Sequence, residues 1–184
     1  MLGMAPVGIH FATLLAPPIR VAVLLGDITV GVDAGSTSET RTSGTSTSTA
    51  EYTNQGLNAR YFFGNSFNAS LGYHMRNYSA VATSTSLGTN TSETFTLDAK
   101  TSVATLGIGN HWLLDWGLWI GGDWVLAGSG LGQTKEVTST GTTTGSPSTT
   151  QRATFKKGAE AAADEMNDWS ASSGFAQFTI GFAF

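Results

Sequence analysis

The chain has 184 residues, the size of one domain, and only 12% of them are charged. The absence of cysteine excludes disulfides and cysteine metal sites, and the net charge of -4 argues against a nucleic-acid surface, which is basic. A helical membrane protein needs about 20 consecutive apolar residues for each span, and the mean hydropathy of +0.00 gives no sign of one. Residues 1–184 are therefore expected to form one domain, whose strands are identified by alternating apolar and polar residues.

The first strand is predicted over residues 7–15. Apolar residues at positions 7, 9, 11 and 15 alternate with their neighbours up to Pro17 and Pro18, which cannot lie inside a paired strand and predict a tight turn. Met1 to Leu15 makes a poor signal peptide, because no Lys or Arg precedes its apolar run and His10 interrupts it.

The second strand is predicted over residues 20–33. Apolar residues at positions 28, 30 and 32 fall on one face, and polar residues at positions 27, 29 and 33 fall on the other. Residues 35–50, which follow, are nearly pure Ser, Thr and Gly. Because this segment has little apolar surface to bury, we expect it to be a solvated loop.

The third and fourth strands are predicted on either side of a turn at Gly64-Asn65. The third covers residues 54–63, with apolar residues at positions 57, 59, 61 and 63. The fourth, residues 67–76, is the clearest in the chain, because its two faces differ completely. One face carries Phe67, Ala69, Leu71, Tyr73 and Met75, and the other carries Asn68, Ser70, Gly72, His74 and Arg76.

The fifth and sixth strands, residues 104–112 and 118–129, are joined by a short turn at residues 114–116. Trp119 falls on the polar face of the sixth strand and needs a space inside. The Ser/Thr-rich residues 84–94 and the polar residues 130–173 are expected to be loops. Residues 159–167 are rich in helix formers, but the lysines at their start and the acids near their end oppose the helix dipole, so a helix and a loop are equally expected there.

The last strand alternates between apolar residues and small or polar residues up to the final residue. Its apolar face contains Phe178, Ile180, Phe182 and Phe184, and Gly181 lies three positions before the end. This ending resembles the closing strand of bacterial outer-membrane β-barrels, whose C-terminal aromatic residue serves as an assembly signal. The resemblance implies that Phe178, Ile180, Gly181, Phe182 and Phe184 form such a signal and that the barrel-assembly machinery is a partner.

The alternation of short turns with long polar segments resembles the small outer-membrane barrels of the OmpA, OmpX and OmpW kind. The resemblance implies an all-β, antiparallel, up-and-down transmembrane barrel of the eight-stranded type, in the outer membrane of a Gram-negative bacterium, in contact with lipid and lipopolysaccharide. Aromatic residues gather near the short turns and the terminus, as in the girdle at a membrane interface. The residues expected in this girdle are Phe63, Phe67, Trp112, Trp116 and Phe184.

A soluble β-sandwich or lipocalin-like barrel would show the same alternation, with the apolar face pointing inward. Its outer face would then be rich in charged residues. Here the polar face consists of Gly, Ser, Thr and Asn with few charges, and this composition favours the membrane barrel.

Five ionisable residues within the strands all fall on the polar face and are predicted to line the lumen. On the lipid face an arginine would cost about 2 to 4 kcal/mol at the membrane midplane. Inside, the same groups can pair, so we expect a hydrogen-bonded charge network that plugs the lumen. The residues of this network are Asp27, Arg60, His74, Arg76 and Asp123.

Catalysis and cofactor binding find little support in the sequence. The three histidines, His10, His74 and His111, lack metal-binding spacing. His74 with Ser70 is the only local His/Ser pair, and no acid is placed beside it. We expect a protein without cofactor or enzymatic activity, with a structural or surface-interaction, adhesion-like role carried by its long loops. The alternatives are a narrow, porin-like pore or conduit for small hydrophobic molecules and, with less support, a lipid A-modifying enzyme.

About seven strands are counted, whereas single-chain bacterial barrels have an even number. An unpaired edge in lipid is costly for every unsatisfied backbone group. The count therefore predicts one more strand and a signal peptide upstream of Met1, and a gap of one strand's width between the first and last strands.

Overall fold

The computed structural model describes residues 2–8, 19–43, 46–86, 91–142, 177–182 and the single residues 157, 160, 161, 164 and 168. The strands form a closed antiparallel barrel in up-and-down order, so the predicted fold class is confirmed. They are β1 (Leu2–Gly8), β2 (Ile19–Leu25), β3 (Ile28–Ser43), β4 (Ser46–Phe63), β5 (Phe67–Ser86), β6 (Thr91–Leu113), β7 (Leu118–Thr142) and β8 (Gln177–Phe182).

The single strand predicted over residues 20–33 is in fact a hairpin of β2 and β3. Leu25 pairs with Ile28 across a two-residue turn, in which Gly26 adopts a φ of 61°. Glycine takes this left-handed conformation without the steric cost that a side chain brings. The extra turn raises the count from about seven strands to eight among the described residues.

β1 pairs with both of its neighbours in the barrel, so the predicted gap is absent. Leu2 lies opposite Phe182 on β8 and opposite Val21 on β2. The prediction of a gap was wrong because it rested on an odd number of strands, in which β2, the turn at Gly26 and β3 formed a single strand. β1 occupies residues 2–8, while residues 9–15 of the predicted first strand and the predicted turn at Pro17-Pro18 lie outside the described residues.

Where the structure describes the polar segments predicted as solvated loops, residues 35–43, 46–50, 84–86, 91–94 and 130–142 are strands, which corrects the prediction there. β3 and β4 stay paired up to Ser43 opposite Ser46, and β6 and β7 stay paired up to Ser92 opposite Thr142. Threonine is β-branched and suits a strand, and the ladder bonds satisfy the backbone without apolar burial. Threonine hydroxyls also meet across the strands, as between Thr40 Oγ1 and Thr49 Oγ1 at 3.0 Å. In the region where a helix and a loop were equally expected, the described residues are helical.

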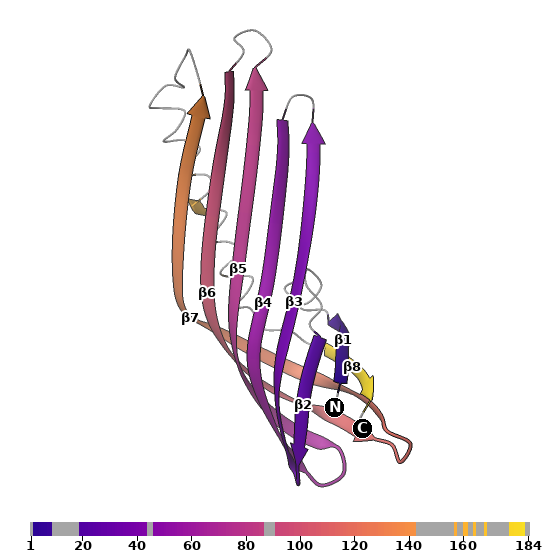
Figure 1. Cartoon of the computed structure of the whole chain (residues 1–184). Coiled ribbons are helices and arrows are strands. Elements are labelled where there is room, and N and C mark those ends of the chain that lie inside the picture. Colours follow the sequence, from indigo (N-terminus) through magenta and orange to yellow (C-terminus); the bar gives the residue numbers. More distant parts are fainter. Residues whose placement is uncertain are drawn as a thin grey trace.

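The molecule has two storeys, which Figure 1 shows clearly. In the lower storey all eight strands close the barrel, and the turns of the β2–β3, β4–β5 and β6–β7 hairpins lie at its end. Above it, β3 to β7 continue side by side as an open, curved sheet (Figure 1). The ladder between β2 and β3 ends at Ile19 opposite Ala34, whereas β3 runs on to Ser43.

The outer wall of the barrel is apolar and the inner face is polar. On β5, Leu71 and Met75 are 62% and 54% exposed, whereas Asn68 and Arg76 are 0% and 6% exposed. Alternation breaks on β7, where register shifts lie at Trp124 and Leu131. Residues 127 and 129, predicted on the inner face, are therefore exposed, because each bulge residue moves the following side chains to the opposite face.

Candidate functional site in the barrel lumen

An ion pair between Arg60 and Asp123 crosses the middle of the lumen. The guanidinium nitrogens Nη1 and Nη2 lie 2.6 and 2.9 Å from the two carboxylate oxygens. Arg60 comes from β4 and Asp123 from β7, strands that are not neighbours, and both side chains are about 5% exposed or less. Two parallel charge-assisted bonds hold this bridge in one geometry.

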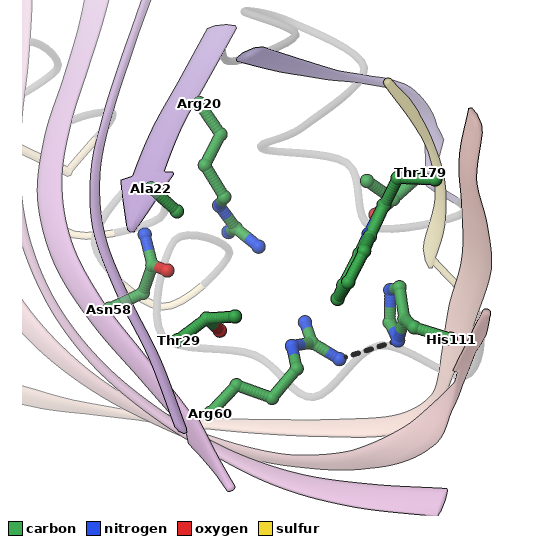
Figure 2. A pocket seen from close by; sticks show the side chains of 8 residues that line it. Arg20, Ala22, Thr29, Asn58, Arg60, His111 and Thr179 are labelled. Carbon is green, nitrogen blue, oxygen red and sulfur yellow. Dashed lines mark hydrogen bonds between the residues drawn. The ribbon is translucent and has the colours of Figure 1, made fainter. Parts of the chain in front are cut away.

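Asn68 and His111 extend the bridge into a buried cluster. Arg60 donates to Asn68 Oδ1 and to His111 Nδ1, the latter at 2.7 Å (Figure 2). Trp119 covers this cluster, and its ring centroid lies 5.7 Å from that of His111 and 5.5 Å from that of Phe62. Trp119 is only 6% exposed. We name Arg60, Asn68, His111 and Asp123 the lower cluster.

A second group of polar side chains surrounds Asp33. The carboxylate accepts from Arg20 Nη2 at 3.1 Å and from Asn58 Nδ2 at 3.0 Å, and its other oxygen lies 3.3 Å from His74 Nδ1. His74 Nε2 lies 3.2 Å from Thr105 Oγ1. We name Arg20, Asp33, Asn58 and His74 the upper cluster.

Two glycines make room for His74 on the adjacent wall. A Cβ on Gly56 would lie 2.8 Å from Asp33 Oδ1, and a Cβ on Gly72 would lie 2.7 Å from His74 Nε2. Real Cβ atoms do not approach other atoms so closely, so a larger residue at either position would displace the imidazole. Gly56 and Gly72 therefore leave the space that the His74 side chain needs inside the barrel.

Arg76 differs from the two paired arginines. It is 6% exposed, and Nε donates to Asn54 Oδ1 at 3.2 Å, but Nη1 is buried with no hydrogen-bond partner among the residues that the structure describes. Among the described residues no carboxylate lies within ion-pair distance of it. The nearby Tyr52 hydroxyl is also buried and unpartnered, and burial raises the pKa of Tyr52 although the charge of Arg76 opposes this.

The five residues predicted for the charge network divide into four inside and one outside. Arg60, His74, Arg76 and Asp123 all point into the barrel, but in separate clusters. Asp27 does not, because it forms the exposed β2–β3 turn. The network also contains residues that the prediction lacked, including Arg20 and Asp33. The sequence placed Asp33 on the polar face of its strand. Its pairing with Arg20 could have been predicted only from the correct β2–β3 register.

The predicted girdle residues lie on the outside near the turns. Phe63, Phe67, Trp112 and Trp116 are all exposed, and the rings of Phe63 and Phe67 are 5.9 Å apart. Of the predicted assembly signal, Phe178, Ile180 and Phe182 face outward from β8 and Gly181 is buried. Phe184, which belongs to both sets, lies outside the described residues, and the signal stays a prediction.

The hydroxyl that lies beside His74 Nε2 is that of Thr105, whereas the sequence had placed Ser70 near this histidine. The row Asp33, His74 and Thr105 has the order carboxylate, imidazole, hydroxyl that some hydrolases use. Thr105 is only 7% exposed and a Cβ on Gly72 would already touch its hydroxyl, so there is no room beside it for a substrate carbonyl. Within the described ranges no three potential ligands gather as a metal site. Nor does any described helix have the length and hydropathy of a membrane span.

The class that these features define is a small, closed antiparallel β-barrel with a filled polar lumen and an apolar outer wall. No protein-family model matches the sequence, and neither does any curated protein. Among solved structures, the crystal structure of Acinetobacter baumannii CarO is similar, with 15% identity and a TM-score of 0.43. That alignment covers 99% of this chain and 97% of CarO.

Proposed function

We propose that this chain is a barrel protein of the bacterial outer membrane, with its lower storey in the lipid. The observation that carries the proposal is the belt of exposed large apolar side chains around the barrel. Soluble proteins rarely expose contiguous apolar patches larger than a few hundred Å². Members of the belt include Val21, Val23, Leu25, Ile28, Val30, Val32, Leu57, Tyr61, Leu71, Tyr73, Met75, Leu106, Ile108, Ile120, Phe178, Ile180 and Phe182.

The height of the belt suits a membrane. On β5 the outward apolar residues run from Phe67 to Met75, and a strand crosses a bilayer in about 9 to 11 residues. Beyond Met75 the next exposed residue is Asn77, and beyond Leu57 on β4 the exposed residues are Gln55 and Glu51. Aromatic residues lie at the end of the barrel that carries the short turns, and such positions suit an interface girdle. Trp116 and Phe182 are examples, with their ring centroids 6.3 Å apart.

The upper storey supports a structural or surface-interaction role on the outside of the cell. β5 is 20 residues long, about twice what a membrane crossing needs, so half of it stands above the belt. The surface that this half offers is a Ser/Thr-rich sheet rather than the loops that the sequence suggested. The filled lumen favours this role over the narrow pore, because the Arg60–Asp123 bridge occupies the centre.

Site-directed spin labelling tests the membrane placement in lipid vesicles. The chain has no cysteine, so Leu71→Cys carries a single label in the belt, and Asn77→Cys is the matched control on the same strand and face. We expect oxygen to reach the label at 71 better than a polar nickel complex does, and the reverse at 77. Equal access of the polar complex to both labels would mean that the belt is not in lipid.

Labelling of intact cells tests the orientation. Glu51→Cys in the upper storey should react with a membrane-impermeant maleimide on intact cells. Asn65→Cys in the β4–β5 turn should react only after the outer membrane is permeabilised. The opposite order of reaction would place the upper storey in the periplasm and remove the surface role, even if the belt lies in lipid.

A further inference from the structure

A small cavity lies inside the barrel between the upper and lower clusters. Its volume is about 20 Å³, and Figure 2 shows the side chains of Arg20, Arg60 and His111 around it. Ala22 and Thr179 also line it, from β2 and β8. About 10 to 15 Å³ of such space is enough for one water molecule.

Three buried polar atoms around this cavity have no hydrogen-bond partner in the part of the chain that the structure describes: Arg20 Nε, His111 Nε2 and Thr179 Oγ1. His111 and Thr179 are 1% and 4% exposed. An unpaired buried polar group costs about 1 to 3 kcal/mol, so three around one cavity would be expensive. The three residues come from β2, β6 and β8, and all of them line this cavity.

The protonation of His111 follows from its other contacts. Its Nδ1 faces Arg60 Nη1 at 2.7 Å and Asn68 Nδ2 at 3.2 Å. Both neighbours are donors, since a guanidinium has no acceptor and Asn68 Oδ1 already accepts from Arg60. Nδ1 must therefore be the acceptor, and the proton lies on Nε2. The cavity accordingly presents two N–H donors and one hydroxyl.

We propose that this cavity binds one ordered water molecule. The water oxygen accepts from Arg20 Nε and His111 Nε2, and one of its hydrogens is donated to Thr179 Oγ1. The charges around the cavity favour water over an anion, because Arg20 is paired with Asp33 and Arg60 with Asp123. The water joins the upper and lower clusters into one polar plug and links β2, β6 and β8 across the lumen. This site does not depend on the membrane placement.

The first test is a high-resolution crystal structure of the whole chain, with a second crystal soaked in bromide. We expect one density peak about 2.7 to 3.2 Å from the three atoms, without anomalous signal after the soak. An empty cavity would overturn the proposal. A bromide peak at the site would overturn it in favour of a small anion.

The second test is nuclear magnetic resonance of the folded protein in micelles. The His111 Nε2 proton should be protected from exchange and show a cross-peak to a long-lived water. Ala22→Val should abolish the cross-peak by filling the cavity, and Thr179→Val should weaken it by removing one partner. Thr101→Val is the matched control, since Thr101 also faces inward but does not line the cavity. Circular dichroism checks that each variant folds, and persistence of the cross-peak in Ala22→Val would contradict the assignment.

Discussion

At the scale of single residues, the three inward-facing arginines in the described ranges differ in how their charge is compensated. Arg60 has Asp123 and Arg20 has Asp33, while Arg76 has only the amide of Asn54. Removing one member of a buried ion pair leaves the other charged and unpaired, whereas removing a buried charge that has no ion-pair partner leaves no charge behind. Replacement by methionine should therefore have different effects on the stability of the barrel at Arg60 and at Arg76.

We predict that Arg60→Met destabilises the barrel by about 3 to 5 kcal/mol, because it leaves the Asp123 carboxylate buried without a partner. Arg76→Met, the matched variant, should leave the stability unchanged or raise it. Urea unfolding of both proteins in lipid vesicles measures the two differences. A similar loss in both variants would show that Arg76 has a compensating partner.

At the scale of strands, the outward face of β5 lies partly within the apolar belt and partly above it. Leu71 and Val81 both face outward, but only Leu71 lies in the belt. Leu71→Arg should destabilise the protein in vesicles by about 2 to 4 kcal/mol, the cost of arginine on the lipid face near the midplane. Val81→Arg should change little. Comparable stability of the two variants would argue that the belt does not lie in lipid.

Alternation alone predicted which face of each strand is apolar, and β5 shows why this works. Each residue from 67 to 76 keeps its parity because the strand has no bulge there. The same method failed at Gly26, since Leu25 and Ile28 flank a turn only two residues long and the apolar pattern runs through it. It failed again at Trp124, where a bulge changes the parity, and bulges leave no reliable trace in a pattern of period two.

The cross-lumen contacts were harder to predict than the faces. Parity placed Arg60 and Asp123 inside, but their pairing depends on the shape of the closed barrel, which joins β4 to β7 across two intervening strands. The Ser/Thr-rich strands were missed for another reason. Low apolar content predicts a loop, but a paired ladder satisfies the backbone of threonine and serine without any burial.

At the scale of the whole molecule, the filled lumen has an electrical consequence. The Arg60–Asp123 bridge, His111 and Trp119 occupy the cross-section of the barrel. We predict that the protein shows no steady conductance in planar bilayers, with insertion verified by the spin label at position 71. Ohmic steps from the wild-type protein would require the plug to move and would revive the pore alternative.

The strands that close the barrel are among its shortest. β1 and β8 have 7 and 6 residues, whereas β5, β6 and β7 have 20, 23 and 25. Each inner hairpin joins residues near in sequence, but Leu2 opposite Phe182 joins nearly the two ends of the chain, at the highest entropic cost of loop closure for one of the smallest ladders. During folding the seam is thus the last pairing to form and the first to open. Substitutions in β1 and β8 should consequently act on the rate of unfolding and leave the folding rate almost unchanged.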